Sequence, residues 1–379
     1  MSGTIAVPES ASHNAFAADL FSVVVDKKYT DNVVFSPASV QVSLALAYGG
    51  AEGHTAEEMR KVLKLPEDDK TQVLEQYKVF LKTFFKSAKS TEDAPLLKMA
   101  NRLYVNKQLN ISPEFNTIAQ DYFNTQAENV DFNKNKQVVE NINHWVEQQT
   151  ENKIKNLLAP DAVNGQTSAV LVNAIYFKAK WLHPFSATST SKAAFFINNK
   201  QKIEVDTMFT DDRFGYVELP ELEATALEMP YKDSDMSMLI ILPNDKEGLE
   251  KLETKLKNWD LNQITTKMSV QDVEVFLPKF RIEYNIDLKE PLKQVSFLFR
   301  SHWITCSFNL IISFYKLGLN SMFDQTANFS GLFENAQHQK ISDVKHKAFL
   351  DVNEAGSEAA AATCKNFFYF LLHFFFFFI

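Results

Sequence analysis

The chain is poor in glycine and cysteine for its length. Its 379 residues include 10 glycines and 2 cysteines, Cys306 and Cys364. The glycines never fall at the G-x-G-x-x-G or G-x-x-x-x-G-K-S/T spacing, which excludes the common dinucleotide-binding and P-loop motifs. So few cysteines provide no disulfide framework, and this fits a reducing compartment without excluding secretion.

Motifs for metal binding and catalysis are also missing. H-E-x-x-H, G-x-S-x-G and C-x-x-C do not occur, and the eight histidines never pair at metal-ligand spacing. We therefore expect no metal, no cofactor and no enzymatic activity. A serine, a histidine and an aspartate could still converge in space, since a chain of this length contains all three.

Positive charge is in deficit. The chain has 39 Lys and Arg against 47 Asp and Glu, a formal net charge of -8. Such a field repels nucleic-acid phosphates and anionic lipids, so neither nucleic acid nor a membrane is an expected partner. Residues 1–12 show no basic or apolar stretch typical of a secretory signal. The sequence as written predicts a cytoplasmic protein, or an extracellular one if the N-terminus is incomplete.

Helical patterns dominate the first half of the chain. Apolar residues at helical spacing and N-terminal Ser-Pro pairs mark most of them, and Thr55 to Glu58 forms a capping box. The predicted helices cover Ser12–Val25, Pro37 to Gly50 after an N-cap at Ser36, Thr55 to just before Pro66, Thr71–Ser87, a segment opening at Ser112-Pro113, and Asn135–Gln149.

Strand patterns dominate the second half. Ser168–Phe177 is apolar on both faces, which predicts a strand buried on both sides. Lys345–Val352 alternates, with His346 and Ala348 on one face and Lys347 on the other. No repeat or long linker separates the two halves, so we expect one α+β domain over residues 10–379. The other predicted strands are Leu97–Val105, Ala226–Met229, Met236–Leu242 and Asp272–Glu283.

The segment Glu354–Thr363, rich in alanine, directly follows a predicted strand. Alanine favours a helix, and a flexible linker is equally open. With a period of two, Ser357, Ala359, Ala361 and Thr363 share one small, uncharged face, and Glu358 lies on the other. Such a face could enter the middle of a sheet without a clash or a buried charge.

Several segments, in order, are similar to those of the serpin family, from about residue 10 to Thr363. The resemblance implies an α+β domain with a helix-rich N-terminal half, large mixed and antiparallel sheets, and a mobile reactive loop. The matching segments are Asn32–Ser39, Gly49-Gly50 with Thr55, Asn101–Val105, Ile142–Val146, Ile154–Leu157, Leu171–Trp181, Leu227–Tyr231, Met238–Pro243, Phe276–Phe280 and Glu354–Thr363.

The resemblance implies a suicide inhibitor of serine proteases. In the family, a protease cleaves the exposed loop, and the freed hinge inserts as a new strand of the main sheet. Inhibitory members have small hinge residues, as here. The hinge matches Glu354, Gly356, Ser357, Ala359, Ala360, Ala361, Ala362 and Thr363, and the polar cluster that controls sheet opening matches Ser36, Ser39, Asn173 and His346.

Two further features of the sequence, a tryptophan and a lysine stripe, match the family less specifically. Trp181 matches a tryptophan beneath the top of the sheet, although an ordinary core aromatic would look the same. Lys78, Lys82 and Lys86 recur every four residues, as on a helix that binds sulfated polysaccharide in some serpins, but a solvated helix face is the favoured interpretation. The protein is expected to be a monomer whose partner is a serine protease, chymotrypsin-like or other.

Two segments depart from the family pattern. Residues 294–315 form an apolar insert, and the tail 364–379, rich in phenylalanine, is too short for the remaining loop and strands. The hinge register puts Phe370 at the bait position, but the short tail leaves the bait residue unknown. The alternative is therefore a non-inhibitory or truncated serpin-fold protein, from a splice form or a faulty gene model, that acts at most as a binding module.

Overall fold

The computed structural model describes residues 10–25, 32–65, 69–86, 94–257, 259, 261–295, 318–334 and 339–357, with backbone alone at 10–12, 84–86 and 262. The predicted insert, most of the hinge and the tail therefore lie outside the described residues, apart from residues 294 and 295. The helices are α1 Ser10–Val24, α2 Pro37–Gly50, α3 Gly53–Val62, α4 Lys70–Lys86, α5 Pro113–Phe123, α6 Asn135–Gln149, α7 Leu249–Leu256, α8 Asn262–Lys267 and α9 Lys289–Gln294, with short 3-10 turns η1 Phe132–Lys134, η2 Ala187–Ser189 and η3 Ser321–Phe323.

The strands form two large sheets and one small pair. The first sheet has the order β10-β12-β13-β4-β1-β3, and the second has the order β5-β6-β7-β8 with β9 paired to β6. The strands are β1 Leu96–Asn106, β2 Asn110–Ile111, β3 Ala127–Val130, β4 Ala169–Lys180, β5 Ser191–Phe196, β6 Lys202–Leu219, β7 Ala224–Pro230, β8 Ser237–Pro243, β9 Ser269–Pro278, β10 Phe280–Asp287, β11 Phe333–Glu334, β12 Asp343–Asn353 and β13 Gly356–Ser357.

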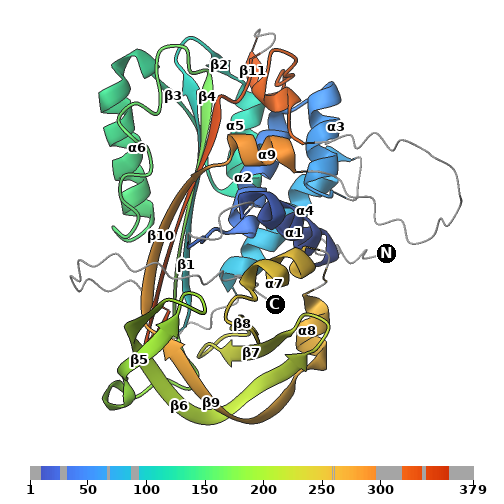
Figure 1. The fold of residues 1–379 in the computed structure, drawn as a ribbon. Helices are drawn as coiled ribbons and strands as arrows, with labels where there is room; N and C mark the ends of the chain where they lie inside the picture. The colour runs from blue at the N-terminus through green and yellow to red at the C-terminus, as the bar shows by residue number, and fades with distance from the viewer. Residues whose placement is uncertain are drawn as a thin grey trace, which may run out of the picture.

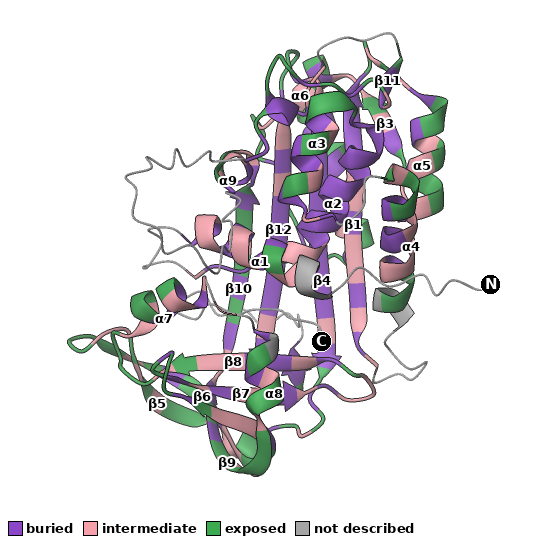
Figure 2. Cartoon of the chain, turned by 90° about the vertical axis from the view of Figure 1, so that its right-hand side faces the viewer, coloured by how far each residue is buried: buried purple, intermediate pink, exposed green. Residues whose placement is uncertain are grey.

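Helices cover both faces of the first sheet. Figure 1 shows α6 on one face and α1, α2 and α5 on the other, with the second sheet and helices α7 and α8 below. Helix α2 is buried along almost its whole length (Figure 2) and packs against strands β4 and β1. This two-sided cover explains why β4 is buried on both faces, as its apolar sequence predicted.

Two helix starts are confirmed, and one is wrong. The side chains of Ser36 and Ser112 accept hydrogen bonds from the backbone N–H groups of Ser39 and Phe115, so both serines are N-caps. Helix α3 instead begins at Gly53, two residues before the predicted capping box. The Thr55 hydroxyl accepts a hydrogen bond from the backbone N–H of Asn328, a residue far along the chain.

Two strand predictions need correction. The run Asp272–Glu283 is not one strand, because β9 ends at Pro278 and β10 begins at Phe280 in the other sheet. Strand β12 is buried on both faces, including Lys347 and Phe349, since α6 packs against the face that these two residues share. The alternating pattern therefore separates two faces of the strand that pack into different hydrophobic cores, and neither face is exposed to solvent.

Candidate functional site at the parting of strands β4 and β12

Strands β4 and β12 pair along part of their length and separate at one end. They run parallel, with seven residue pairs from Asp343↔Val170 to Phe349↔Tyr176. Beyond this point β13 lies between them, antiparallel to both, with Ser357 opposite Ala179 on one side and Val352 on the other. The first two residues of a new central strand are thus already seated in the sheet.

Gly356 fits this narrow place because it has no side chain. Its backbone approaches β4 so closely that an added Cβ would lie 2.0 Å from the carbonyl oxygen of Ala179. Its φ of 159° borders on extended backbone, so the close approach is the decisive constraint. The glycine of the predicted hinge therefore lets the chain turn in between the two strands.

Ser357 is fully buried, and its hydroxyl is satisfied. Its Oγ lies 2.9 Å from the hydroxyl oxygen of Tyr231. Burial raises the pKa of Tyr231, so this hydroxyl stays protonated and available for hydrogen bonding. A small polar side chain is accommodated here, whereas a large or charged one would have neither room nor a partner.

Trp181 holds the backbone that leads into β13. Its indole Nε1 donates to the carbonyl oxygen of Asn353 at 3.0 Å, and its backbone N–H donates to Ala355 at 3.0 Å. The indole stacks on Tyr231, with ring centroids 4.9 Å apart and planes 10° apart. Trp181 therefore lies at the base of the hinge, in contact with the backbone of Asn353 and Ala355.

Glu354 ties the same segment to the other sheet. Its carboxylate lies 2.9 Å from Lys279 Nζ and accepts a hydrogen bond from the Thr190 hydroxyl at 2.8 Å. Partial burial raises the pKa of Glu354, but the hydrogen bonds from Lys279 and Thr190 outweigh it, and the pKa lies below its usual value. The carboxylate is therefore ionised and anchored near neutral pH.

The four residues predicted as a polar cluster meet under the paired part of β4 and β12. His346 Nε2 accepts the backbone N–H of Ser36 at 3.1 Å, and its Nδ1 hydrogen-bonds the side-chain oxygen of Asn173. Asn173 also donates to the hydroxyl and the carbonyl oxygen of Ser39, at 2.5 and 3.2 Å. His346 and Asn173 are direct neighbours across the two strands, so the cluster bridges their junction.

The protonation of His346 follows from these partners. Since Nε2 accepts a backbone N–H, the proton resides on Nδ1, which donates to Asn173. Burial lowers the pKa of His346 to about 3, because the imidazolium would lose its hydration. The ring is neutral near physiological pH and joins α2, β4 and β12.

The structure adds two residues to this cluster. Asn101 on β1 accepts hydrogen bonds from the Ser43 hydroxyl at 2.9 Å and from the Asn173 side chain. The Ser43 hydroxyl also donates to the Ser39 carbonyl oxygen at 3.0 Å. The spacing of Ser36, Ser39 and Ser43 on one face of a helix could have indicated Ser43, and Asn101 opens a segment that resembles the family, but neither side chain was predicted as part of the cluster.

The structure gives less information on the remaining predicted site residues. Lys78 lies 3.7 Å from a Glu75 carboxylate oxygen and 5.1 Å from the Tyr122 ring centroid, so its charge already has neighbours. Lys82 is exposed, and the side chain of Lys86 lies outside the described part. Residues Ala359, Ala360, Ala361, Ala362 and Thr363 and the bait position Phe370 are also outside the described residues.

Other kinds of site were sought over the same part of the chain. Within it, no three His, Cys, Asp or Glu side chains come together as metal ligands. No helix in the described ranges has the length and apolar character needed to cross a membrane.

Known proteins share both the sequence and the fold. A model of the family "Serpin (serine protease inhibitor)" matches residues 11–298 and 302–378, and so runs through most of the predicted insert and almost all of the tail. The chain is 35% identical to serine protease inhibitor 42Dd of Drosophila melanogaster over 341 residues, covering 90% of this chain and 83% of the relative. It is 35% identical to the leukocyte elastase inhibitor of Bos taurus, covering 93% and 88%. Serpin48 of Tenebrio molitor, a solved structure, is 36% identical, with a TM-score of 0.80 and coverage of 94% and 89%.

Proposed function

This chain belongs to the serpin family of serine protease inhibitors, and we propose that it traps its protease by inserting the cleaved hinge between β4 and β12. The observation that carries this proposal is the position of β13. Gly356 and Ser357 already occupy one end of the junction, antiparallel to both neighbours. Further insertion only has to continue a register that is already established.

The register shows where each hinge residue would go. Ser357 faces Val352 of β12 and Ala179 of β4. Continued two residues at a time, this pairing brings Ala359 opposite Leu350, Ala361 opposite Ala348 and Thr363 opposite His346. Directly paired residues share a face, so the four small residues that start with Ser357 would join the face of β12 that carries His346 and Ala348.

The polar cluster marks the end of this path. In the continued register Thr363 would lie between His346 and Asn173, which are now direct neighbours. Full insertion of the hinge therefore has to break the hydrogen bond between these two side chains. The cluster holds the junction closed in the form that exposes the loop, and insertion of the hinge as far as Thr363 replaces four of the seven β4–β12 pairs, from Phe349↔Tyr176 to His346↔Asn173, with two new sets of strand pairs.

The charged hinge residue has a suitable place on the other face. Glu358 would lie beside Lys178 of β4 and Asp351 of β12, at the end of the sheet where Asp351 is only partly buried. Ala360 and Ala362 would follow on this face, toward Phe349 and Lys347. Both residues are small, so they could pass beneath α6 with little change in the packing of that helix. A bulky residue at either position would force a larger change.

The proposed partner is a serine protease, bound by the monomeric inhibitor. The test is to mix the purified protein with chymotrypsin, trypsin and elastase and to look for a covalent complex on a denaturing gel. We expect a complex with at least one of them. Cleavage of the loop without any complex, and without a rise in the melting temperature of the cleaved chain, would favour the alternative of a non-inhibitory serpin fold.

A hinge variant separates insertion from protease recognition. Ala361→Arg leaves β13 as it is but would place a charge against Ala348 in the buried face. We expect this variant to be cleaved at the normal rate and to release active protease. Ala361→Ser is the matched control, since it stays small and should still form the complex. Equal complex yields from both variants would contradict insertion in this register.

A further inference from the structure

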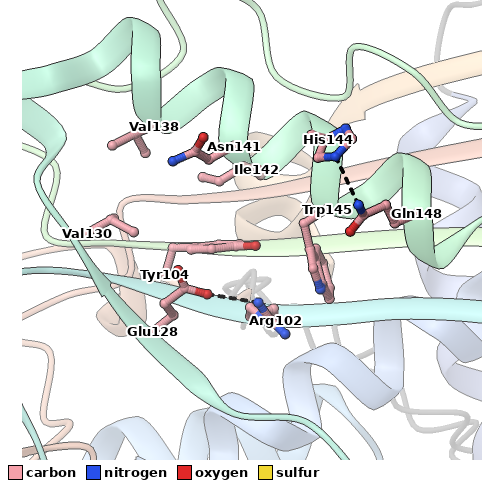
Figure 3. A pocket seen from close by; sticks show the side chains of 10 residues that line it. All are labelled: Arg102, Tyr104, Glu128, Val130, Val138, Asn141, Ile142, His144, Trp145 and Gln148. Carbon is pink, nitrogen blue, oxygen red and sulfur yellow. Dashed lines mark hydrogen bonds and ion pairs between the residues drawn. The ribbon is translucent and has the colours of Figure 1, made fainter.

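A cavity lies on the edge of the first sheet, away from the β4–β12 junction. It is about 330 Å³ in volume and opens between α6 and the strands β1 and β3 (Figure 3). This size is at the lower end of small-molecule sites, which span roughly 300–1,000 Å³. Its wall is half apolar or aromatic and half polar: Tyr104, Val130, Val138, Ile142 and Trp145 line it together with Arg102, Glu128, Asn141, His144 and Gln148.

Arg102 gives this wall one specific polar group. Its Nη1 is 2.8 Å from Glu128 Oε2, and its Cζ is 4.2 Å from the centre of the Trp145 ring. Its Nε has no acceptor within hydrogen-bond distance in the described part of the chain, but protein atoms cover it and the Tyr104 hydroxyl lies near the guanidinium, so a ligand oxygen reaches Nε only when a neighbouring side chain moves aside. A buried donor without an acceptor is costly, so an acceptor oxygen brought by a ligand would be favoured at this place.

The charges around the cavity select the ligand. Arg102 is already paired with Glu128, and the other lining groups are uncharged when His144 is neutral. A second carboxylate beside Arg102 would be repelled by Glu128, whereas a neutral carbonyl would satisfy the Nε donor without repulsion. We propose that this cavity binds an uncharged, planar aromatic molecule of about two fused rings whose ketone-type oxygen accepts a hydrogen bond from Arg102 Nε.

Occupancy of the cavity would also act on strand insertion, an extension that rests on the proposed function. The segment after α6 is fixed to the far side of the junction, because Lys347 of β12 donates to the Lys155 carbonyl oxygen at 2.7 Å and Asn285 of β10 donates to Leu157 at 2.9 Å. The Asn143 side chain, on α6, holds the backbone of Leu158 in the same segment.

The opposite wall of the cavity lies on the other side of the junction. Strands β1 and β3 are joined to β4 and would move with it when a new strand enters. One added strand widens a sheet by about 4.8 Å. Because α6 contacts β1 directly through Trp145 and is linked to β10 and β12 through the segment that follows it, widening of the sheet must change the cavity, and a ligand bound there stabilises the form that exposes the loop.

Binding can be measured without any protease. The probe is 6-propionyl-2-dimethylaminonaphthalene, a neutral two-ring ketone. Its fluorescence emission reports an apolar environment, and the molecule accepts excitation energy from Trp145. Its matched anion is 6-dimethylamino-2-naphthoate. We expect saturable binding of one ketone per chain, about tenfold tighter than the anion. No saturable binding, or tighter binding of the anion, would overturn the proposal.

Four variants locate the bound ketone. Arg102→Met keeps the side-chain stem but removes the donor, and should weaken binding about tenfold. Asn141→Trp places an indole at the rim of the cavity and should abolish binding, whereas Glu140→Trp, on an exposed position that does not line the cavity, should not. Glu128→Gln should reduce the difference in binding affinity between the ketone and the anion. Binding that is the same in all these variants would place the probe elsewhere.

The effect on insertion is read from inhibition. At saturating ketone, the number of inhibitor molecules consumed per protease inactivated should rise about twofold or more, because slower insertion allows more release. The Asn141→Trp variant should show no such rise. An unchanged stoichiometry in the wild type would refute the coupling while the binding site stands. If the protein forms no protease complex even without ketone, the proposed function fails, and the binding result is unaffected.

Discussion

Strand β4 has two long neighbours, and the two junctions are built differently. On one side it pairs with β1, antiparallel, over ten residue pairs. On the other side it pairs with β12, parallel, over seven pairs, and then the two strands part around β13. The first junction is continuous from end to end, while the second ends in an opening that a strand has begun to fill.

The residues beneath the two junctions overlap at Asn173. Leu103 of β1 and Leu171 of β4 are paired, fully buried and part of the main hydrophobic core. Asn173 is paired with Asn101 across the first junction and with His346 across the second, and its side chain hydrogen-bonds both of them. The polar group therefore belongs to both junctions, and what sets the second apart is the opening that β13 has begun to fill.

The largest expected effect comes from damage to the closed junction. Leu103→Ala should lower the free energy of unfolding by about 2–5 kcal/mol, because it removes buried methyl groups and leaves a cavity. The yield of protease complex should not change at temperatures where the variant is folded. Chemical denaturation and a gel assay measure the two quantities. Leu103→Met is the control and should cost less than about 1.5 kcal/mol.

Acid should lower the free energy of unfolding through His346, which lies beneath the β4–β12 junction. The unfolded chain titrates His346 near pH 6.5, while burial lowers its folded pKa to about 3. Between these values the unfolded chain binds the extra proton, so stability rises with pH and is lost as pH falls from 6.5 toward 3. The slope from this group is about 1.4 kcal/mol per pH unit.

The contribution of His346 can be isolated with one variant. Gln can accept the Ser36 N–H and donate to Asn173 but does not titrate, so His346→Gln should flatten the slope by about one proton. Denaturation midpoints from pH 4.5 to 7.5 compare the two proteins. Parallel curves would show that His346 does not carry this dependence, and the acid loss would then belong to other groups.

A smaller loss is expected from the asparagine on β4. Asn173→Ala removes donors to Ser39 and Asn101 and the acceptor for His346, and should lower the free energy of unfolding by about 1–3 kcal/mol. In contrast to Leu103→Ala, it should also speed the spontaneous loss of inhibitory activity at raised temperature, because the junction opens more easily. Incubation at several temperatures followed by a protease assay measures this rate. Loss rates equal to those of Leu103→Ala would erase the distinction between the junctions.

Local sequence patterns predicted much of this fold. Helix and strand positions followed from periodicity and N-caps, as at Ser36 and Ser112, and the apolar run of β4 predicted its burial on both faces. The capping box at Thr55 failed because a distant backbone N–H, that of Asn328, takes its hydroxyl. Patterns of adjacent residues cannot report such a competitor.

The site divides along the same line. The small face of the hinge was predicted from its residue pattern, whereas the cluster of Ser36, Ser39, Asn173 and His346 was predicted only through the family resemblance. Asn101, Tyr231 and Lys279 were not predicted, because each belongs to a strand or loop whose position depends on the whole sheet. Register across strands that are far apart in the chain is a tertiary property, and one sequence does not determine it by inspection.

The smallest expected effect concerns the ion pair at the base of the hinge. Lys279 and Glu354 are 2.9 Å apart, but the lysine is 38% exposed, so solvent screens the pair and its contribution should be no more than about 1 kcal/mol. Glu354→Gln keeps an acceptor for Thr190 and should lower the unfolding free energy within that limit. A double-mutant cycle with Lys279→Met isolates the pair. Because Glu354 lies beside the open end of the junction, we also expect Glu354→Gln to change the complex yield more than Lys107→Met, which breaks an exposed pair with Asp131 after the end of β1. Equal effects would mean that the position of an ion pair relative to the opening is irrelevant.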